Sequence, residues 1–198
     1  MNGVVQIVDD DPAVRDALVW IFKSRGVDSV TWDSATRFLD GYRDCDKGCL
    51  VLDVRMPEMS GIELFDRLRQ RGCTLPVIFL TGHGDVPLAV QAIKDGAFDF
   101  LEKPFDDNAM VDRVLAALRL HEASTAAASR KEELRTALNH LTAREREVMD
   151  LVLVGKLNKV IADELGIAMR TVEVHRARIF EKMGVRSAVE LSQLLASL

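Results

Sequence analysis

The first 105 residues alternate short apolar runs with amphipathic stretches, and this alternation restricts the fold more than any other feature of the sequence. Five apolar runs predict strands at Val4–Val8, Val27–Thr31, Cys49–Leu52, Pro76–Leu80 and Phe98–Leu101. Helical patterns lie between and after them at residues 12–25, 34–43, 61–70, 86–95 and 107–120. Strands and helices that alternate at this spacing form a parallel sheet with helices on both faces. We therefore expect an α/β doubly wound, five-stranded parallel sheet, whose functional groups gather at the carboxyl ends of its strands.

A second region, from Leu134 onward, carries no strand pattern. Its apolar periodicity predicts four helices at Leu141–Val154, Lys159–Leu165, Met169–Met183 and Ser187–Leu198. Between the regions, residues 121–132 are rich in Ala, Ser and charge and fit either a helical connector or a flexible tether, with composition favouring the helix. We therefore divide the chain into an α/β domain (1–120), a linker (121–137) and a small all-α four-helix domain (138–198).

Polar side chains follow four of the predicted strands. Asp9–Asp11 come directly after the first strand, Asp53 after the third, Thr81 after the fourth and Lys103 after the fifth. In a parallel sheet these strand ends share one edge, so carboxylates, a hydroxyl and an ammonium converge there. Crowded carboxylates favour a hard cation such as Mg²⁺, and a carboxylate beside Mg²⁺ can attack phosphorus. The alternative is that these acids are solvated turn residues and helix caps.

Four motifs in this region resemble the receiver domain of bacterial response regulators: VDDD, LDVRMPEMSG, TGHGDVPLAV and GAFDFLEKPF. Two stretches, TGHGDVPLAV and EKPF, particularly resemble the FixJ branch. The resemblance covers about residues 4–120 and implies a flavodoxin-like fold. It implies that Asp53 accepts a phosphoryl group from a sensor histidine kinase. It also implies a Mg²⁺ site in which Asp10 binds directly, Asp9 binds through water, and Asp53 and the backbone carbonyl of Arg55 complete the protein ligands.

The same resemblance implies a switch. Thr81 is the hydroxyl that moves to the phosphoryl oxygen, Lys103 pairs with the phosphoryl group, and Phe100 is the aromatic residue that rotates inward. The face formed by Val86–Asp95 and Phe98–Leu101 is then the expected dimerisation surface.

Other functions fit parts of the first region. A phosphatase of the haloacid dehalogenase type would use Asp53 as nucleophile, but it needs a second Asp two residues later, where this chain has Arg55. His83 is either a loop residue or a group that adjusts the lifetime of the acyl phosphate. A pure adaptor, which signals through protein contacts alone, is another alternative. We therefore expect a protein that is not an enzyme with an external substrate.

The charge of the chain is divided unevenly. The formal net charge is −5, yet residues 1–120 hold 20 acidic and 14 basic side chains (net −6), whereas residues 121–198 hold 11 and 12 (net +1). The whole-chain charge therefore does not exclude nucleic acid as a partner of the second region. No run approaches the roughly 20 apolar residues of a membrane span, and we expect a cytoplasmic protein.

The second region has the layout of a helix-turn-helix. Thr142 and Glu145 form a capping-box pattern, and Gly166 permits a tight turn between a short helix and a longer one. The buried face of the longer helix is predicted to hold Val172, Ile179 and Met183. Residues 138–186 resemble the LuxR/NarL/FixJ type, which implies binding to double-stranded DNA. The alternative is an ordinary helical bundle with a solvated basic face.

The outward face of the longer helix predicts the DNA contacts. Glu173, Val174 and Ala177 are candidates for base edges, because Glu accepts from cytosine N4 and small apolar groups meet a thymine methyl. Phosphate contacts are predicted for Arg170, Thr171, Arg178, Lys159 and Asn158. Leu157 and Ala168 stand where relatives often carry Ser, and Ala168 thereby removes an expected helix cap.

Together these features predict a transcription regulator. Phosphorylation of Asp53 stabilises an active receiver, and active receivers pair. The two recognition helices of the pair (Met169–Met183 in each copy) then bind two DNA half-sites. The predicted partners are a sensor histidine kinase, double-stranded DNA, a second copy of the chain and, as a further candidate, RNA polymerase.

Overall fold

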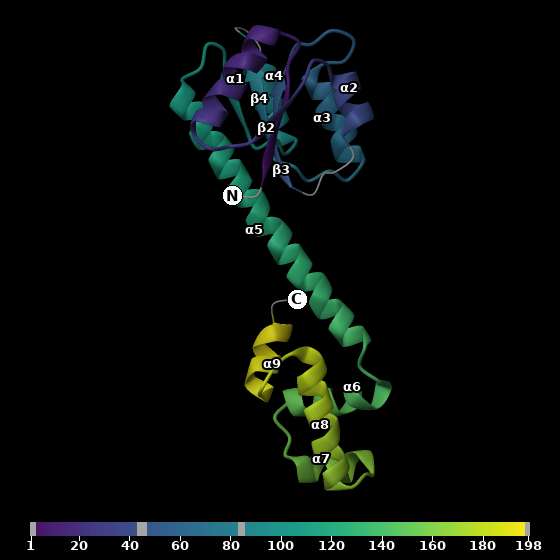
Figure 1. Cartoon of the computed structure of the whole chain (residues 1–198). Coiled ribbons are helices and arrows are strands. Elements are labelled where there is room, and N and C mark those ends of the chain that lie inside the picture. Colours follow the sequence, from purple (N-terminus) through teal and green to yellow (C-terminus); the bar gives the residue numbers. More distant parts are fainter. Residues whose placement is uncertain (1–2, 43–46, 83–85, 197–198) are drawn as a thin grey trace. The chain divides into compact units, whose positions relative to one another are not determined.

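The computed structural model describes residues 3–42, 47–82 and 86–196, and the chain forms two compact units, residues 1–125 and 126–198 (Figure 1). The strands are β1 (Val4–Val8), β2 (Ser29–Trp32), β3 (Gly48–Asp53), β4 (Val77–Thr81) and β5 (Asp99–Glu102). The helices of the first unit are α1 (Pro12–Ser24), α2 (Ala35–Gly41), α3 (Gly61–Gln70) and α4 (Val86–Lys94). Helix α5 (Asp107–Asn139) runs from the first unit into the second. The second unit then contains α6 (Ala143–Leu153), α7 (Asn158–Leu165), α8 (Met169–Met183) and α9 (Ala188–Leu195).

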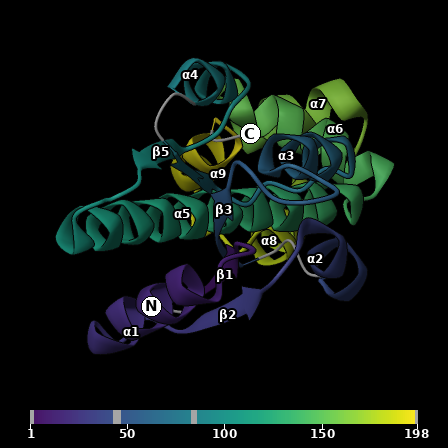
Figure 2. The same ribbon diagram turned by 90° about the horizontal axis from the view of Figure 1, so that it is seen from above.

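The five strands form one parallel sheet in the order β2-β1-β3-β4-β5, which confirms the doubly wound prediction. Helices α1 and α5 pack on one face of this sheet, where Leu18 and Met110 are fully buried. Helices α2 and α3 cover the other face through Phe38 and Leu64 (Figure 2). The register aligns Val8 with Leu52 and Asp53 with Leu80, so the carboxyl ends of these strands lie at one edge.

One predicted strand begins too early. The apolar pattern places Val27 in the second strand, but β2 starts at Ser29. The Val27 amide donates to the Phe22 carbonyl (3.0 Å), and Gly26 before it takes a left-handed φ of 69°. Val27 is buried at the end of α1. A buried apolar residue at this position gives the same sequence pattern as a buried strand residue.

Helix α5 has 33 residues, so the helix predicted over residues 107–120 continues through the proposed linker to Asn139. The domain boundaries at 120 and 138 stay a prediction, since a single helix crosses both positions. Among the described helices, none combines the length and the apolar character needed to cross a membrane.

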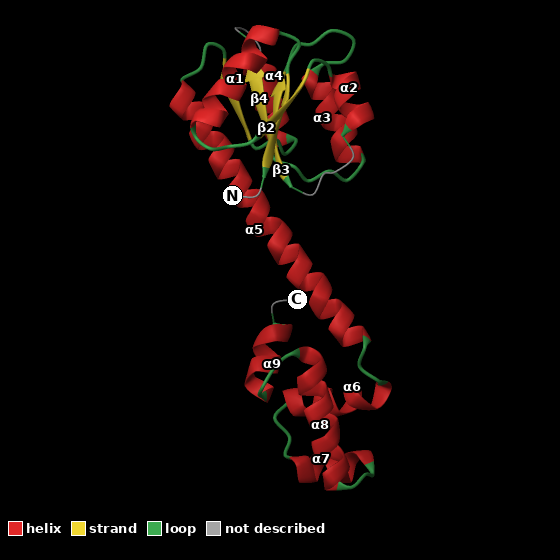
Figure 3. Ribbon diagram, viewed as in Figure 1, coloured by secondary structure: helices red, strands yellow, loops and turns green. Residues whose placement is uncertain are grey.

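The described part of the second unit contains helices joined by turns and loops, and no strand (Figure 3). Its core contains Val172, Ile179 and Met183 of α8, which confirms the predicted buried face. The capping box is also confirmed, because the Glu145 amide donates to Thr142 Oγ1 and the Thr142 amide donates to Glu145 Oε2. Gly166 ends α7 at a left-handed φ of 63°, as the tight turn requires.

Candidate functional site

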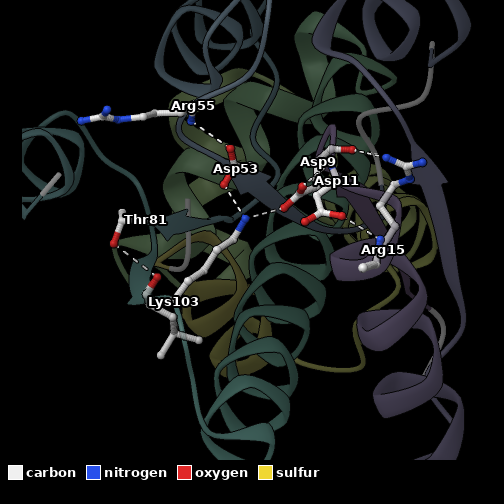
Figure 4. Close-up of polar contacts among 9 residues, drawn as sticks. Asp9, Asp11, Arg15, Asp53, Arg55, Thr81 and Lys103 are labelled. Carbon is white, nitrogen blue, oxygen red and sulfur yellow. Dashed lines mark hydrogen bonds and ion pairs between the residues drawn. The ribbon is translucent and has the colours of Figure 1, made fainter. Parts of the chain in front are cut away.

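Three predicted site residues meet at the carboxyl edge of the sheet. Asp9 follows β1, Asp53 ends β3, and Lys103 follows β5. The Lys103 ammonium lies between the two carboxylates, with Nζ 2.7 Å from Asp9 Oδ2 and 2.6 Å from Asp53 Oδ1 (Figure 4). Both carboxylates are buried. The ammonium therefore bridges them and offsets their mutual repulsion.

The loop after β1 arranges its three acids differently. Asp9 Oδ1 accepts from the Asp11 amide (2.9 Å), and Asp11 Oδ1 accepts from the Ala13 amide (2.8 Å). Asp11 is thus the N-cap of α1, followed by Pro12 at the first helical position, so the helix-cap alternative holds for this acid. Asp10 is exposed and has no partner among the described residues.

The loop after β3 holds Asp53 from the other side. Its Oδ2 accepts from the Arg55 amide at 2.9 Å. Gly61, at the start of α3, lies so close that a Cβ there would sit 2.1 Å from the Asp53 carbonyl oxygen. Ser60 and Glu63 cap α3 reciprocally. A glycine is required at Gly61 because the helix begins directly against the strand that ends in Asp53.

Burial and charge act in opposite directions on the ionisable groups of this pocket. Burial raises the pKa of the Asp53 carboxyl, and the hydrogen bond and charge of Lys103 lower it without cancelling the rise. Burial lowers the pKa of the Lys103 ammonium, but its hydrogen bonds to Asp53 and Asp9 raise it more, so the net shift is upward. The ammonium is therefore held in its charged form.

The other residues of the predicted switch lie on β4 and β5. Thr81 is fully buried, and its hydroxyl donates to the Leu101 carbonyl at 3.4 Å. Phe100 is half-buried and packs against the core on the α2–α3 side of the sheet. The peptide bond between Lys103 and Pro104 is cis. His83 lies outside the described residues.

The pocket supplies oxygen donors of the kind that Mg²⁺ prefers. Among the described residues, no three acidic, histidine or cysteine side chains converge on one point in metal-binding fashion. The reason is local: Lys103 occupies the space between Asp9 and Asp53, and the Asp10 side chain faces outward. A cation at this edge would offset the repulsion between the Asp9 and Asp53 carboxylates, as the Lys103 ammonium does here.

The outer surface of α4 is apolar. Leu88, Val90 and Ile93 are 50%, 43% and 37% exposed, whereas Ala92 and Ala97 are buried. Val90 and Ile93 are therefore available on the predicted dimerisation face rather than in the core, and Ala97 belongs to the core.

The outward face of α8 carries the candidates for DNA contact. Val174, Ala177 and Arg178 are exposed, and so are Arg170 and Thr171 near the start of the helix. Glu173 is half-buried. At the start of α7, Asn158 is half-buried and Lys159 exposed. Neither α7 nor α8 has a side-chain cap at its N-terminus, as the residues at positions 157 and 168 imply.

Two charged side chains of α8 interact within their own helix. The Arg176 guanidinium lies over the Phe180 ring, 5.5 Å from the ring centroid, and the Glu173 carboxylate lies 3.6 Å from the Arg170 guanidinium. Glu173 is therefore engaged within its own helix.

Two contacts between residues far apart in the sequence link α6 to α7 and to α8. The sequence patterns did not indicate them. Arg144 of α6 donates to the Leu165 carbonyl at the end of α7 (2.5 Å). Lys182 of α8 lies 2.7 Å from Glu145, at the start of α6. These pairs are 21 and 37 residues apart, so no local periodicity indicates them.

Comparison with protein families decides the identity of this pair of sites. Residues 5–115, more than half of the chain, match the family model described as the response regulator receiver domain. The chain belongs to the response regulators. Residues 139–195 of the regulator match the model for bacterial regulatory proteins of the luxR family. The regulator is therefore a non-enzymatic, two-component transcription regulator with a receiver and a LuxR-type DNA-binding domain.

Individual relatives agree with this assignment over nearly the whole regulator. It is 52% identical over 196 residues to the C4-dicarboxylate transport transcriptional regulatory protein DctR of Rhodobacter capsulatus, covering 98% of this chain and 100% of that protein. It is 46% identical over 194 residues to FixJ of Azorhizobium caulinodans, covering 96% of this chain and 90% of that one. The structure of the response regulator StyR matches with a TM-score of 0.93 and 42% identity, covering 100% of both chains. Full-length FixJ from B. japonicum matches with a TM-score of 0.62 and 40% identity, covering 100% of this chain and 97% of that one.

Proposed function

We propose that Mg²⁺-dependent phosphorylation of Asp53 by a partner histidine kinase causes the regulator to pair and to bind DNA sequence-specifically. The observation that carries this is the Lys103 ammonium shared between the Asp9 and Asp53 carboxylates. Two buried carboxylates with one ammonium leave a net negative pocket that can take up a further cation. Receiver domains as a family imply a histidine kinase and use Mg²⁺, and LuxR-type domains imply DNA.

The proposed roles follow the position of each group. Asp10, which is unpartnered among the described residues, would bind Mg²⁺ directly. Asp9 would bind it through water, and Asp53 and the Arg55 carbonyl would complete the protein ligands. When Mg²⁺ is bound, it shields the attacking carboxylate and the phosphoryl oxygens from one another.

The switch would begin at the phosphoryl group. Lys103 would pair with one phosphoryl oxygen. The Thr81 hydroxyl would leave the Leu101 carbonyl and donate to a second phosphoryl oxygen. Phe100 would then turn inward and change the face of α4 and β5, where exposed apolar side chains favour pairing.

Pairing would bring α8 of each copy to one of two DNA half-sites. Glu173, Val174 and Ala177 are the proposed base contacts. The proposed phosphate contacts are Asn158, Lys159, Arg170, Thr171 and Arg178. We place the regulator in the cytoplasm, where its DNA would be, with RNA polymerase as a further candidate partner, and we retain the boundaries at residues 120 and 138.

The direct test is selection from random DNA with the intact regulator, with and without Mg²⁺ and beryllofluoride as a phosphoryl mimic. We expect the mimic to produce dimers in size-exclusion chromatography and to enrich a two-half-site sequence. Asp53→Asn should show neither effect. If the mimic changed neither the oligomeric state nor the selected DNA, the proposed switch would be wrong. Promoters of C4-dicarboxylate transport genes are the first natural DNA to compare, since DctR is a relative.

A further inference from the structure

Arg15, on the first turns of α1, stands beside three consecutive acids and binds none of their carboxylates. Its Nη1 donates to the Asp9 backbone carbonyl at 2.7 Å (Figure 4). In the part of the chain that the structure describes, it forms no ion pair. A guanidinium that served only to neutralise acids would be expected to bind a carboxylate through two parallel hydrogen bonds. Its contact with the backbone calls for a different explanation.

The Asp9 carbonyl belongs to the peptide that joins Asp9 to Asp10. The neighbouring groups of Asp9 are also fixed: its amide donates to the Trp32 carbonyl (3.2 Å), and its carboxylate binds Lys103. The amide and the carboxylate of Asp9 are already engaged, and the Arg15 hydrogen bond also fixes the carbonyl of the peptide that leads to Asp10. The Asp10 carboxylate is exposed and has no partner among the described residues.

We propose that Arg15 is a positioning residue for the magnesium site, which it serves by holding the Asp9–Asp10 peptide. This inference rests on the Mg²⁺-dependent phosphorylation proposed above. Groups that orient metal ligands without touching the metal commonly change metal affinity by about 10- to 100-fold when removed. Arg15 has this relation to Asp10.

Removal of Arg15 has two opposite effects on Mg²⁺ affinity, so the sign of the change separates the explanations. Loss of a positive charge beside acidic residues makes the site more attractive to a cation. Loss of positioning makes the site less able to bind it. A role in charge balance alone therefore predicts tighter binding of Mg²⁺, and a positioning role predicts weaker binding.

The experiment compares the intact regulator with Arg15→Met, Arg15→Lys and the control Arg37→Met. Arg37 is ion-paired with Asp33 at 2.7 Å in the groove that Arg15 also lines, so its removal makes the same change in net charge. Calorimetric titration with MgCl₂ should show about tenfold weaker binding by Arg15→Met. Arg15→Lys, which keeps a charged donor, should recover part of the loss, and Arg37→Met should bind like the parent.

A second readout is the rate of phosphorylation by phosphoramidate at increasing Mg²⁺. For Arg15→Met we expect a higher half-saturating Mg²⁺ concentration and a nearly unchanged rate at saturation, with an unchanged melting curve as proof of folding. Equal or tighter Mg²⁺ binding by Arg15→Met would overturn the inference. Failure of the parent protein itself to become phosphorylated would instead contradict the proposed function.

Discussion

At the scale of single residues, the Asp53 carboxyl is the clearest case of function opposing stability. Burial raises its pKa above the usual 3.8, and Lys103 offsets only part of this. An acid with a raised folded-state pKa destabilises the fold when it is ionised. Asp53→Asn should therefore raise the free energy of unfolding at pH 7 by on the order of 1 kcal/mol.

The extra stability of Asp53→Asn over the parent should decrease as the pH falls through the folded-state pKa of Asp53. It should disappear below pH 3.8, where the parent carboxyl is also neutral. Urea denaturation at several pH values measures this. Asp16→Asn on the exposed side of α1 is the matched control and should change little. A less stable Asp53→Asn at pH 7 would contradict the assigned balance of burial and charge.

Lys103 gives a second prediction at this scale, because it competes with any cation for Asp9 and Asp53. Lys103→Met should bind Mg²⁺ more tightly, by about tenfold, which corresponds to about 1.4 kcal/mol. The same variant should lose dimerisation in response to beryllofluoride, since the phosphoryl group lacks its cation. Calorimetry and size-exclusion chromatography measure the two effects, and weaker Mg²⁺ binding would be inconsistent with competition.

Single residues were predictable where topology alone determines their position. Asp9, Asp53 and Lys103 meet because parallel strands end at one edge, and strand order follows from the alternation of elements. The contact from Arg15 to the Asp9 carbonyl was not predictable, because any side chain long enough to reach a backbone oxygen fits the helical pattern equally well.

At the scale of elements, Glu145 joins the start of α6 to α8 through Lys182. The hydrogen bonds that the Lys182 ammonium and the Thr142 amide donate to its carboxylate lower the Glu145 pKa from 4.5 to about 2. A lowered folded-state pKa contributes stability above pH 4.5 that is lost as the pH falls toward 2. Glu145→Gln should therefore destabilise the helical unit at pH 7, with a difference from the parent that shrinks between these two pH values.

Chemical denaturation of the intact chain at pH 7, 4 and 3, followed by helix content, measures the Glu145 effect. Glu147→Gln is the control, because this exposed glutamate pairs, among the described residues, with Arg144 of its own helix. It should have a small effect at every pH. A loss in Glu145→Gln that stayed constant with pH would show that the carboxylate charge is not responsible.

The N-terminus of α8 offers a stabilising change. Ala168 has the extended backbone of an N-cap (φ −68°, ψ 144°) but no side chain to accept a hydrogen bond. Ala168→Ser should add about 1 kcal/mol to the free energy of unfolding. Ala177→Ser, within the same helix, lacks a free amide to cap and should add nothing. Urea denaturation distinguishes the two, and equal effects would argue against capping.

Element boundaries were predicted best where capping residues mark them. The capping box at Thr142 and the left-handed Gly166 correspond to specific backbone needs, so the sequence indicates them directly. The early start assigned to β2 has the opposite cause: Val27 is apolar because of tertiary packing on α1, which local patterns do not distinguish from strand burial.

At the scale of the whole molecule, the apolar surface of α4 is the proposed route from phosphorylation to DNA. Val90→Lys and Ile93→Lys should leave the unphosphorylated regulator folded and monomeric, since both side chains are partly exposed. With beryllofluoride they should weaken dimerisation at least tenfold, because two like charges would meet across the pair.

Analytical ultracentrifugation with and without the mimic measures this effect. Val30→Lys is the control, because Val30 is similarly exposed at 44% and lies on β2, at the opposite edge of the sheet from β5. Normal dimerisation of the α4 variants would place the pairing surface elsewhere. The exposure of Val90 and Ile93 could not be read from sequence, because an apolar helix face serves a core or an interface equally well.

Helix α8 keeps the side chains that hold the fold apart from those that face outward. Val172, Ile179 and Met183 are buried, whereas Val174 and Ala177 are exposed and contribute no core contacts. Substitutions at such exposed positions usually change stability by no more than about 0.5 kcal/mol. After a gene duplication, a copy could therefore acquire a new set of target promoters through a few codon changes, and every intermediate along that route would remain a folded protein.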